Sequence, residues 1–243
     1  MATELKRAFL LHSRPYRDSS AILDLFTEAH GRVSVVLRGL RGSSKRAAYQ
    51  RGLLQPFTEL ACDYRGRSDL KTLTHLDAYA TLSVQPWQRE RLYAAMYLAE
   101  LLSRVLPVGE PIPELYQHYA HTLQAVQSCT VVESPLRGFE LVLLNALGFA
   151  LDFSQDVDQC DIKPDAFYGY QSELGFVVIA AGHKGGVSGE DILALADADF
   201  SSIDNFSLRP EALQAAKRIT RRALQPLLGD QPLQSRQLYK RLL

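Results

Sequence analysis

The chain has 243 residues, of which 47% are hydrophobic and 22% charged, as in soluble globular proteins. This length suits roughly one or two domains with a sizeable core. No apolar run approaches the ~20 residues needed to cross a bilayer, and the first apolar run is too short for a signal peptide. The cysteines, Cys62, Cys129 and Cys160, lie far apart, which is typical of a reduced intracellular protein without a disulfide framework. We expect a cytoplasmic protein with no membrane contact.

The net charge is zero, but the charges are unevenly distributed. Residues 1–80 carry 13 Lys and Arg against 8 Asp and Glu, a net charge of +5. Residues 81–206 carry 6 against 17, a net charge of −11, and residues 207–243 carry 8 against 2, a net charge of +6. Two basic ends therefore flank an acidic middle. Either the ends bind anions, or they pair with the middle inside the fold.

Five short runs in residues 1–80 have the apolar and β-branched pattern of strands and are separated by turn residues. We expect strands over residues 7–13, 21–27, 32–37, 57–64 and 70–79. Five strands with no helical pattern between most of them predict a small closed β-barrel, and a five-stranded OB-fold fits that count. Such barrels bind single strands in a basic groove with aromatic platforms, and Tyr16 and Tyr49, in polar turn sequences, are the base-stacking candidates.

A basic stretch follows the third expected strand, with no Asp or Glu between Arg38 and Arg51. Its turn-forming residues are Gly39, Gly42, Ser43 and Ser44. These residues favour a flexible loop. Mobile cations can follow a polyanion without being desolvated first, so the loop either contacts phosphates or is a solvated surface loop.

From Gln85 onward the apolar spacing becomes helical. We expect helices from about 86 to 106, from 111 or 113 to 128, from 134 to 147, and from 210 to 228. Ser134 is the expected N-cap of the third helix, with proline at its first position, and Gly148 is expected to end it. A short helix is expected to open at Ser188, and the C-terminal tail at a capping Ser235.

The expected fold class is therefore α+β. An N-terminal OB-fold barrel over residues 1–80 precedes a mainly α-helical C-terminal domain over residues 81–243. A small irregular or β insertion is expected near residues 150–187, with a hairpin formed by residues 166–170 and 176–180.

Two motifs leave an enzymatic alternative open. The loop Gly182–Gly186 looks like a phosphate loop, but Lys184 precedes the glycine pair and breaks the G-x-x-x-x-G-K-[ST] order, so it also reads as a turn before a helix. His118 and His121, with Glu114, have helical spacings that could place metal ligands on one face, although such spacings also arise by chance on a surface. The alternatives to a nucleic-acid-binding protein are a nucleotide- or metal-dependent enzyme and an adaptor with basic surfaces for acidic partners.

Short motifs in a fixed order cover almost the whole chain. In the N-terminal part they are Arg7-Ala8-Phe9, Leu11-His12-Ser13-Arg14-Pro15, Asp24-Leu25-Phe26-Thr27-Glu28, Gly31-Arg32-Val33, Leu53–Phe57 and Lys71-Thr72-Leu73. In the middle they are Glu100–Leu106 and Phe139-Glu140-Leu141 through Leu147-Gly148. Toward the C-terminus they are Ala215–Arg218, Thr220-Arg221, Ala223-Leu224, Pro226, Leu228-Gly229, Pro232-Leu233 and Ser235-Arg236. Together these motifs resemble the RecO family of bacterial recombination mediators.

The resemblance implies an N-terminal OB-fold and a helical C-terminal domain. It implies a DNA repair and recombination mediator without catalytic chemistry, which binds single- and double-stranded DNA and anneals complementary strands. It further implies action on DNA coated by single-stranded-DNA-binding protein (SSB) and, with RecR, loading of RecA, in the cytoplasm at the nucleoid. Annealing requires contacts that neutralise two polyanions and leave base edges free. The DNA-contact candidates are Arg14, Arg32, Arg38, Arg41, Lys45, Arg46 and Arg51.

The resemblance also implies a pocket for the SSB C-terminal tail, which is acidic and ends in an apolar residue. Such a tail requires a small apolar cavity with a cation at its rim. The candidates are Arg137, Phe139, Leu143, Lys217, Arg218 and Arg221. Some family members carry a four-cysteine zinc site after the Leu147-Gly148 motif, but here only Cys160 lies there. Since structural zinc takes four Cys or His ligands, we expect no metal and no other cofactor.

Overall fold

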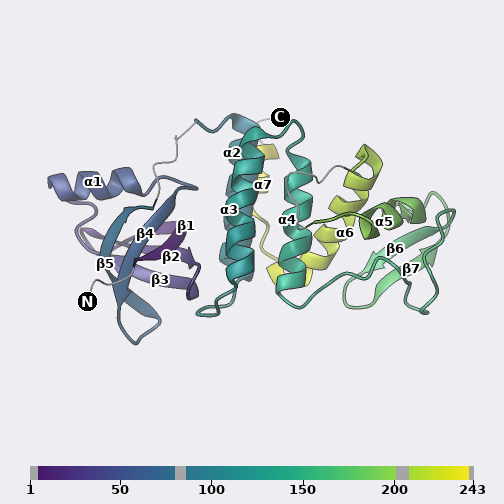
Figure 1. Cartoon of the computed structure of the whole chain (residues 1–243), viewed down its shortest axis with the longest axis horizontal. Helices are drawn as coiled ribbons and strands as arrows, with labels where there is room; N and C mark the ends of the chain where they lie inside the picture. Colours follow the sequence, from purple (N-terminus) through teal and green to yellow (C-terminus); the bar gives the residue numbers. More distant parts are fainter. Residues whose placement is uncertain (1–4, 80–85, 201–207, 241–243) are drawn as a thin grey trace. The chain divides into compact units, whose positions relative to one another are not determined.

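The computed structural model in Figure 1 describes residues 5–79, 86–200 and 208–240. Its first five strands are β1 (Lys6–Tyr16), β2 (Ser20–Thr27), β3 (Gly31–Leu37), β4 (Glu59–Arg65) and β5 (Leu70–Ala78). They form a closed barrel in the order β1-β2-β3-β5-β4, in which β3 and β5 are parallel and the other neighbours antiparallel. The predicted OB-like barrel is confirmed.

Alternating burial along the strands separates the barrel's interior from its outer face. In β3 every second residue is buried and the residues between are half-buried, the pattern of a sheet with one packed side. The interior is built from Ala8, Leu10, Ala21, Leu23, Leu25, Val33, Val35, Leu37, Leu60, Cys62, Leu73 and Leu76. The intervening side chains of β1, β2 and β3 therefore point outward.

Helix α1 (Lys45–Leu53) lies between β3 and β4 in the chain, where the sequence predicted a flexible loop. That prediction was wrong for this segment. Ser44 caps the helix, its side chain accepting a hydrogen bond from the backbone N–H of Ala47 at 3.1 Å. Leu53 and Leu54 then pack against the barrel interior, which fixes the end of the helix. The serine and glycine signals thus mark a cap and a short turn.

The described residues after the barrel form six helices and a small sheet. The helices are α2 (Arg89–Val105), α3 (Pro113–Ser128), α4 (Glu133–Ala146), α5 (Gly189–Ala196), α6 (Pro210–Leu228) and α7 (Gln234–Lys240). The sheet has the order β7-β6-β8, with β6 (Phe167–Gln171), β7 (Gly175–Ile179) and β8 (Val187–Ser188). The mainly helical C-terminal region and the hairpin are confirmed, while the two-residue β8 was not predicted.

The helix ends test the predicted caps. Ser188 caps α5, its hydroxyl accepting from the backbone N–H of Asp191 at 3.2 Å, and Gly148 follows α4 with φ +84. Both were predicted. The predicted caps at Ser134 and Ser235 were wrong, because α4 and α7 each begin one residue earlier.

The chain divides into two compact units. The first holds the barrel, α2, the start of α3 up to Gln117, and the segment from Pro232 onward; the second is His118–Gln231. In the first unit the Glu100 carboxylate fastens α7, accepting hydrogen bonds from the backbone N–H groups of Gln234 and Ser235 at 2.8 and 2.9 Å. The predicted domain boundary between residues 80 and 81 falls outside the described residues. Among those described, no helix combines the length and apolarity needed to span a bilayer.

A buried polar cluster joins the barrel to α3 within the first unit. The Glu59 carboxylate accepts hydrogen bonds from Arg7 Nε at 2.8 Å and from the Tyr116 hydroxyl at 2.9 Å. The Tyr116 ring lies between Phe9 and Phe26, with both ring centroids 5.3 Å away. The apolar rings exclude water from the ion pair, so the barrel and the start of α3 are held together by both kinds of contact.

Candidate nucleic-acid interface

The second half of β1 together with β2 and β3 presents one outward face. The strand register places Arg14 opposite Ile22 and Ile22 opposite Val36. In the adjacent row Tyr16 lies opposite Ser20. Cross-strand partners project to the same side of a sheet. The residues that alternate with these partners along β2 and β3 belong to the barrel interior, so Arg14 and Tyr16 point outward.

A cavity of about 440 Å³ opens at one end of this face. It is lined by Tyr16, Arg17, Ser19, Ser20, Val36, Arg38 and Thr72. Two lining residues are cationic, several are hydroxyl donors and none is acidic, which suits an anion. In OB-folds the face of strands 2 and 3 and the turn between strands 1 and 2 bind oligonucleotides, and the cavity lies at that position.

Arg17 is a cavity residue that the sequence reading missed. It lies in the β1–β2 turn with φ +52, an uncommon backbone conformation for a residue with a side chain. Its guanidinium lies over the Tyr16 ring, 5.1 Å from the centroid, a cation–π contact that places aromatic surface and positive charge together. A basic residue in the turn between two predicted strands was the available signal. Arg65 at the end of β4 and Arg67 in the β4–β5 turn are further exposed cations of the barrel that were not among the predicted contacts.

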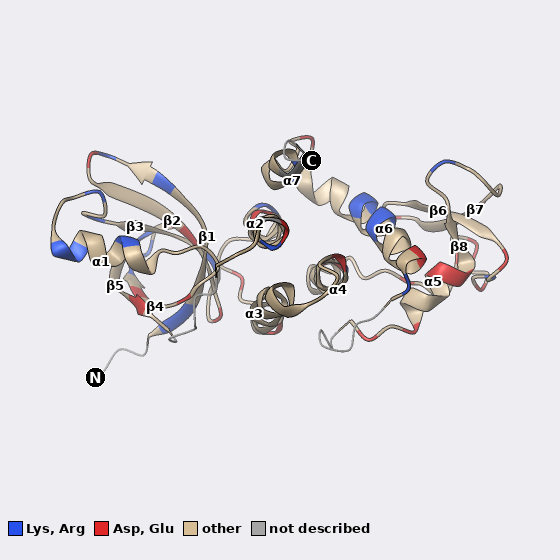
Figure 2. Ribbon diagram, turned by 90° about the horizontal axis from the view of Figure 1, so that it is seen from above, with Lys and Arg blue, Asp and Glu red and all other residues tan. Residues whose placement is uncertain are grey.

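Six of the seven predicted contact cations are exposed: Arg14, Arg38, Arg41, Lys45, Arg46 and Arg51. The backbone N–H of Arg41 donates to the Ser19 carbonyl at 2.9 Å, so the loop after β3 lies against the β1–β2 turn beside the cavity. Lys45 and Arg46 occupy the first turn of α1, which contains no acidic residue. Figure 2 shows this positive charge as blue ribbon at the start of α1.

Two of the predicted cations, Arg32 and Arg51, have structural roles. Arg32 is half-buried and donates from Nε to the Leu106 carbonyl at 2.9 Å. Arg51 donates from Nη1 to the carbonyls of Leu40 and Gly42 at 2.6 and 2.8 Å. Both arginines hold loops in place.

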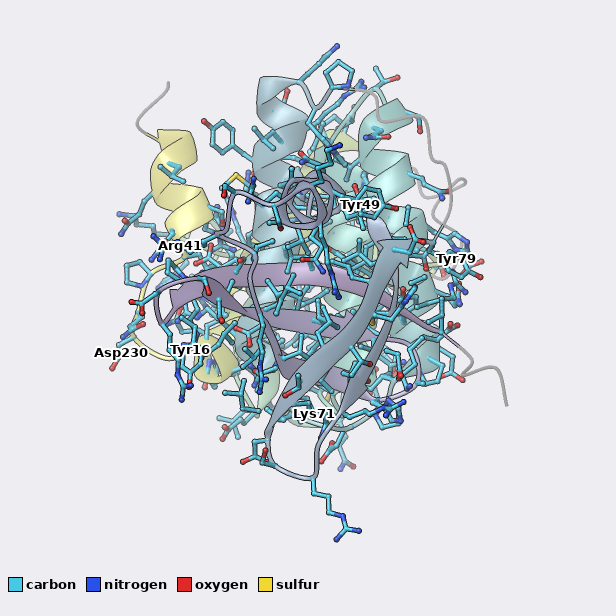
Figure 3. The ribbon with its side chains drawn as sticks, turned by 90° about the vertical axis from the view of Figure 1, so that its left-hand side faces the viewer. Tyr16, Arg41, Tyr49, Lys71, Tyr79 and Asp230 are labelled. Carbon is cyan, nitrogen blue, oxygen red and sulfur yellow. The ribbon has the colours of Figure 1, made fainter. Side chains whose placement is uncertain are left out.

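The two predicted base-stacking tyrosines lie in different surroundings. Neither lies in a turn, because Tyr16 ends β1 and Tyr49 lies in α1. Tyr49 is 57% exposed, and its hydroxyl donates to Asp77 at 2.7 Å, which raises the pKa of the phenol. In Figure 3 Tyr49 lies near Tyr79, away from Tyr16. The structure therefore brings Tyr16, but not Tyr49, to the cavity.

The predicted apolar pocket on α4 is filled by the second unit's own core. Phe139 and Leu143 are fully buried, and the Phe139 ring stacks on His118 with 6.2 Å between centroids. Arg137 is also buried, with Nη2 2.8 Å from the Glu140 carboxylate. In this structure these side chains do not line an open pocket with a cation at its rim.

The basic face of α6 contains the remaining predicted tail-pocket residues. Lys217 forms an ion pair with Glu133. Arg218 and Arg221 are exposed, and Arg218 donates from Nη1 to the Gly186 carbonyl at 2.7 Å. The cations of α6 therefore differ in how far the protein's own carboxylates neutralise them.

The geometry also bears on the enzymatic alternatives. His118 is buried, and burial lowers its pKa to about 4, whereas His121 and Glu114 on the same helix are exposed. The three side chains therefore do not converge. Across residues 5–79, 86–200 and 208–240, no group of three or more His, Cys, Asp or Glu side chains is arranged to hold a metal ion. The loop Gly182–Gly186 leads into β8.

Comparison with known proteins gives one consistent family. The profiles described as "Recombination protein O N terminal" and "Recombination protein O C terminal" match residues 1–81 and 88–237. A Pseudomonas aeruginosa protein named "DNA repair protein RecO" is 40% identical over 231 residues, covering 95% of this chain and 92% of the relative. The relative of that name in Haemophilus influenzae strain 86-028NP is 41% identical over 240 residues, covering 98% and 97%. The relative in Tolumonas auensis is 42% identical over 238 residues, covering 97% and 95%.

Proposed function

The chain belongs to the RecO family of DNA repair proteins, and we propose that it binds single- and double-stranded DNA and anneals complementary strands. In this proposal the barrel's outward face contacts the sugar-phosphate backbone of one strand. The role is non-catalytic: the protein positions strands, and base pairing provides the free energy of annealing. It acts at the nucleoid in the cytoplasm.

The cavity beside the β1–β2 turn is the observation that carries the proposal. Arg17 and Arg38 line it, and Arg14 and Arg41 lie next to it, on the outward face and on the loop against the turn. No carboxylate lines the cavity, so a phosphate does not have to displace one. Asp24, further along the face, is engaged by the Ser34 hydroxyl at 2.5 Å. Because arginine contacts to phosphates carry no base information, binding is expected to be independent of sequence.

Tyr16 supplies the aromatic platform of the proposed site. Its ring is half-buried, so a base stacking on it requires little reordering of the side chain. The Arg17 guanidinium on the ring adds a cation beside the stacked base. Base stacking tolerates any sequence, since every base has a π-face, which agrees with a general annealing role.

We further propose that the partners are those implied by the family resemblance: SSB-coated DNA through the SSB tail, RecR, and RecA at the loading step. Phe139 and Leu143 are fully buried, so they do not offer this tail an open pocket. A tail that binds this unit would have to use another surface or move α4 side chains.

Equilibrium binding of a labelled mixed-sequence oligonucleotide tests the proposed site. Each surface phosphate contact contributes about 1 kcal/mol, so Arg17→Gln/Arg38→Gln should weaken binding about 25-fold. Lys6→Gln is the matched control, because Lys6 on the same barrel is already paired with Asp63 at 2.8 Å. It should change affinity less than about twofold. If the double variant binds as tightly as the control, the barrel face is not the site.

A further inference from the structure

Two arginines of α6 lie against the glycine turn Gly182–Gly186 in the second unit. Arg218 donates from Nη1 to the Gly186 carbonyl at 2.7 Å, and Arg222, one helical turn later, donates from Nη1 to the Tyr170 carbonyl at 2.8 Å. Gly185 has φ +87, and a Cβ built there would lie 3.2 Å from Arg222 Nη2. Glycine at this position therefore allows the turn to adopt its conformation and the guanidinium to approach it closely.

These arginines differ from their basic neighbours in what they bind. Arg209 is held by the carboxylates of Glu190 and Asp191 at 2.6 and 2.9 Å, and Lys217 is paired with Glu133. For Arg218 and Arg222, and for Lys184 in the same turn, no carboxylate of the described residues lies within ion-pair distance. Bonds to neutral carbonyls fix the position of a guanidinium and leave its charge uncompensated.

We propose that Lys184, Arg218 and Arg222 form a second nucleic-acid contact, which binds the phosphodiester backbone of a second strand. This inference rests on the proposed annealing function. All three residues are exposed, and five N–H donors per guanidinium leave several free for phosphate oxygens after one bond to a carbonyl. The glycine turn does not have the residue order of a nucleotide phosphate loop. In this proposal it instead places an arginine pair and a lysine together.

A phosphodiester chain fits this surface better than an acidic peptide tail ending in an apolar residue. Such a tail needs an apolar cavity beside the cation, and the predicted apolar candidates on α4, Phe139 and Leu143, are fully buried. A nucleic-acid backbone needs only exposed cations with fixed positions. Annealing also requires that two polyanions be held by one protein, and the barrel face accounts for one of them.

The test uses the full chain and two non-complementary oligonucleotides, one with a donor dye and one with an acceptor dye. The wild-type protein should bind both strands together and give energy transfer. In Lys184→Gln/Arg218→Gln/Arg222→Gln, binding of the first strand should persist, energy transfer should be lost, and annealing of complementary strands should slow by about tenfold or more. The salt slope for the second strand should become shallower by about 2, since each single-strand phosphate contact contributes about 0.7.

Two further variants keep the test decisive. Lys184→Gln alone removes a side chain with no ion pair in the described structure, so this variant should fold normally. The slope of log affinity on log salt for the second strand should become shallower by about 0.7. Arg209→Gln changes the net charge equally but removes a cation already paired with carboxylates, and it should leave energy transfer intact.

The inference is overturned if the triple variant retains energy transfer, or if Arg209→Gln loses as much energy transfer as the triple variant. It is also overturned if an acidic tail peptide binds at Lys184, Arg218 and Arg222 and DNA does not. Failure of the proposed function gives a different pattern, because Arg17→Gln/Arg38→Gln then leaves first-strand binding unchanged whatever the α6 variants do.

Discussion

Replacing Glu59 should destabilise the first unit strongly, because it leaves Arg7 without its buried partner. Glu59 is 7% exposed and accepts hydrogen bonds from Arg7 at 2.8 Å and Tyr116 at 2.9 Å. Removing one member of a buried pair costs about 3–5 kcal/mol. The Arg7 side chain is 24% exposed and also lies 3.3 Å from Glu28, so the lower end applies. We expect Glu59→Leu to cost about 3 kcal/mol, or ~6–12 °C in melting temperature for a chain of this size.

Urea unfolding of a double-mutant cycle separates the pair from general packing loss. Arg7→Met/Glu59→Leu removes both charges and should recover much of the loss, because apolar residues can replace a buried ion pair at little cost. Arg209→Gln, which breaks a pair that solvent screens, should cost much less than Glu59→Leu. A buried pair that depends on both partners is contradicted if Glu59→Leu costs no more than this control, or if the double variant is less stable than Glu59→Leu alone.

Three other predictions concern pH, backbone and base stacking. His118 has a folded-state pKa of about 4 against 6.5 when unfolded, so the unfolded chain takes up the proton first as pH falls. Between pH 7 and pH 5 the free energy of unfolding of the wild type should therefore fall by about 2 kcal/mol through this residue. His118→Gln should lose correspondingly less, as measured by urea titrations at the two pH values. Gly31 has φ +62, and a Cβ there would lie 1.9 Å from the Glu110 carbonyl oxygen. Gly31→Ala should therefore lower the free energy of unfolding by at least about 2 kcal/mol in the same assay. A smaller loss would mean that the 106–110 loop moves freely. Tyr16→Ala should weaken single-strand binding by at least about fivefold and Tyr49→Ala by less than about twofold, as measured by fluorescence anisotropy, and equal losses would contradict the separation of the two rings.

The barrel and most helices could be predicted because their signals are local. Alternating apolar residues place every second side chain of β3 inside, and glycine at position 148 supplies the left-handed turn after α4. Helix α1 was missed because its turn-forming residues precede a short, weakly apolar segment. Its stability comes from Leu53 and Leu54 packing on the barrel, a contact distant in sequence.

The candidate site could be predicted only in part, because charge in a sequence does not show what a cation binds. Arg32 and Arg51 looked like Arg38 and Arg41, yet they hold loop carbonyls. Apolar residues on α4 suggested a pocket, but the same spacing describes a helix face buried in a core, which is where Phe139 lies. Only the folded structure distinguishes these cases.

The salt dependence of single-strand affinity tests the central claim, that exposed arginines on the barrel face bind the DNA backbone. The affinity should fall with a slope of log affinity on log salt of about −0.7 for each phosphate contact. Arg14→Gln/Arg17→Gln/Arg38→Gln should make this slope shallower by about 2. An unchanged slope with these three cations removed would contradict the account.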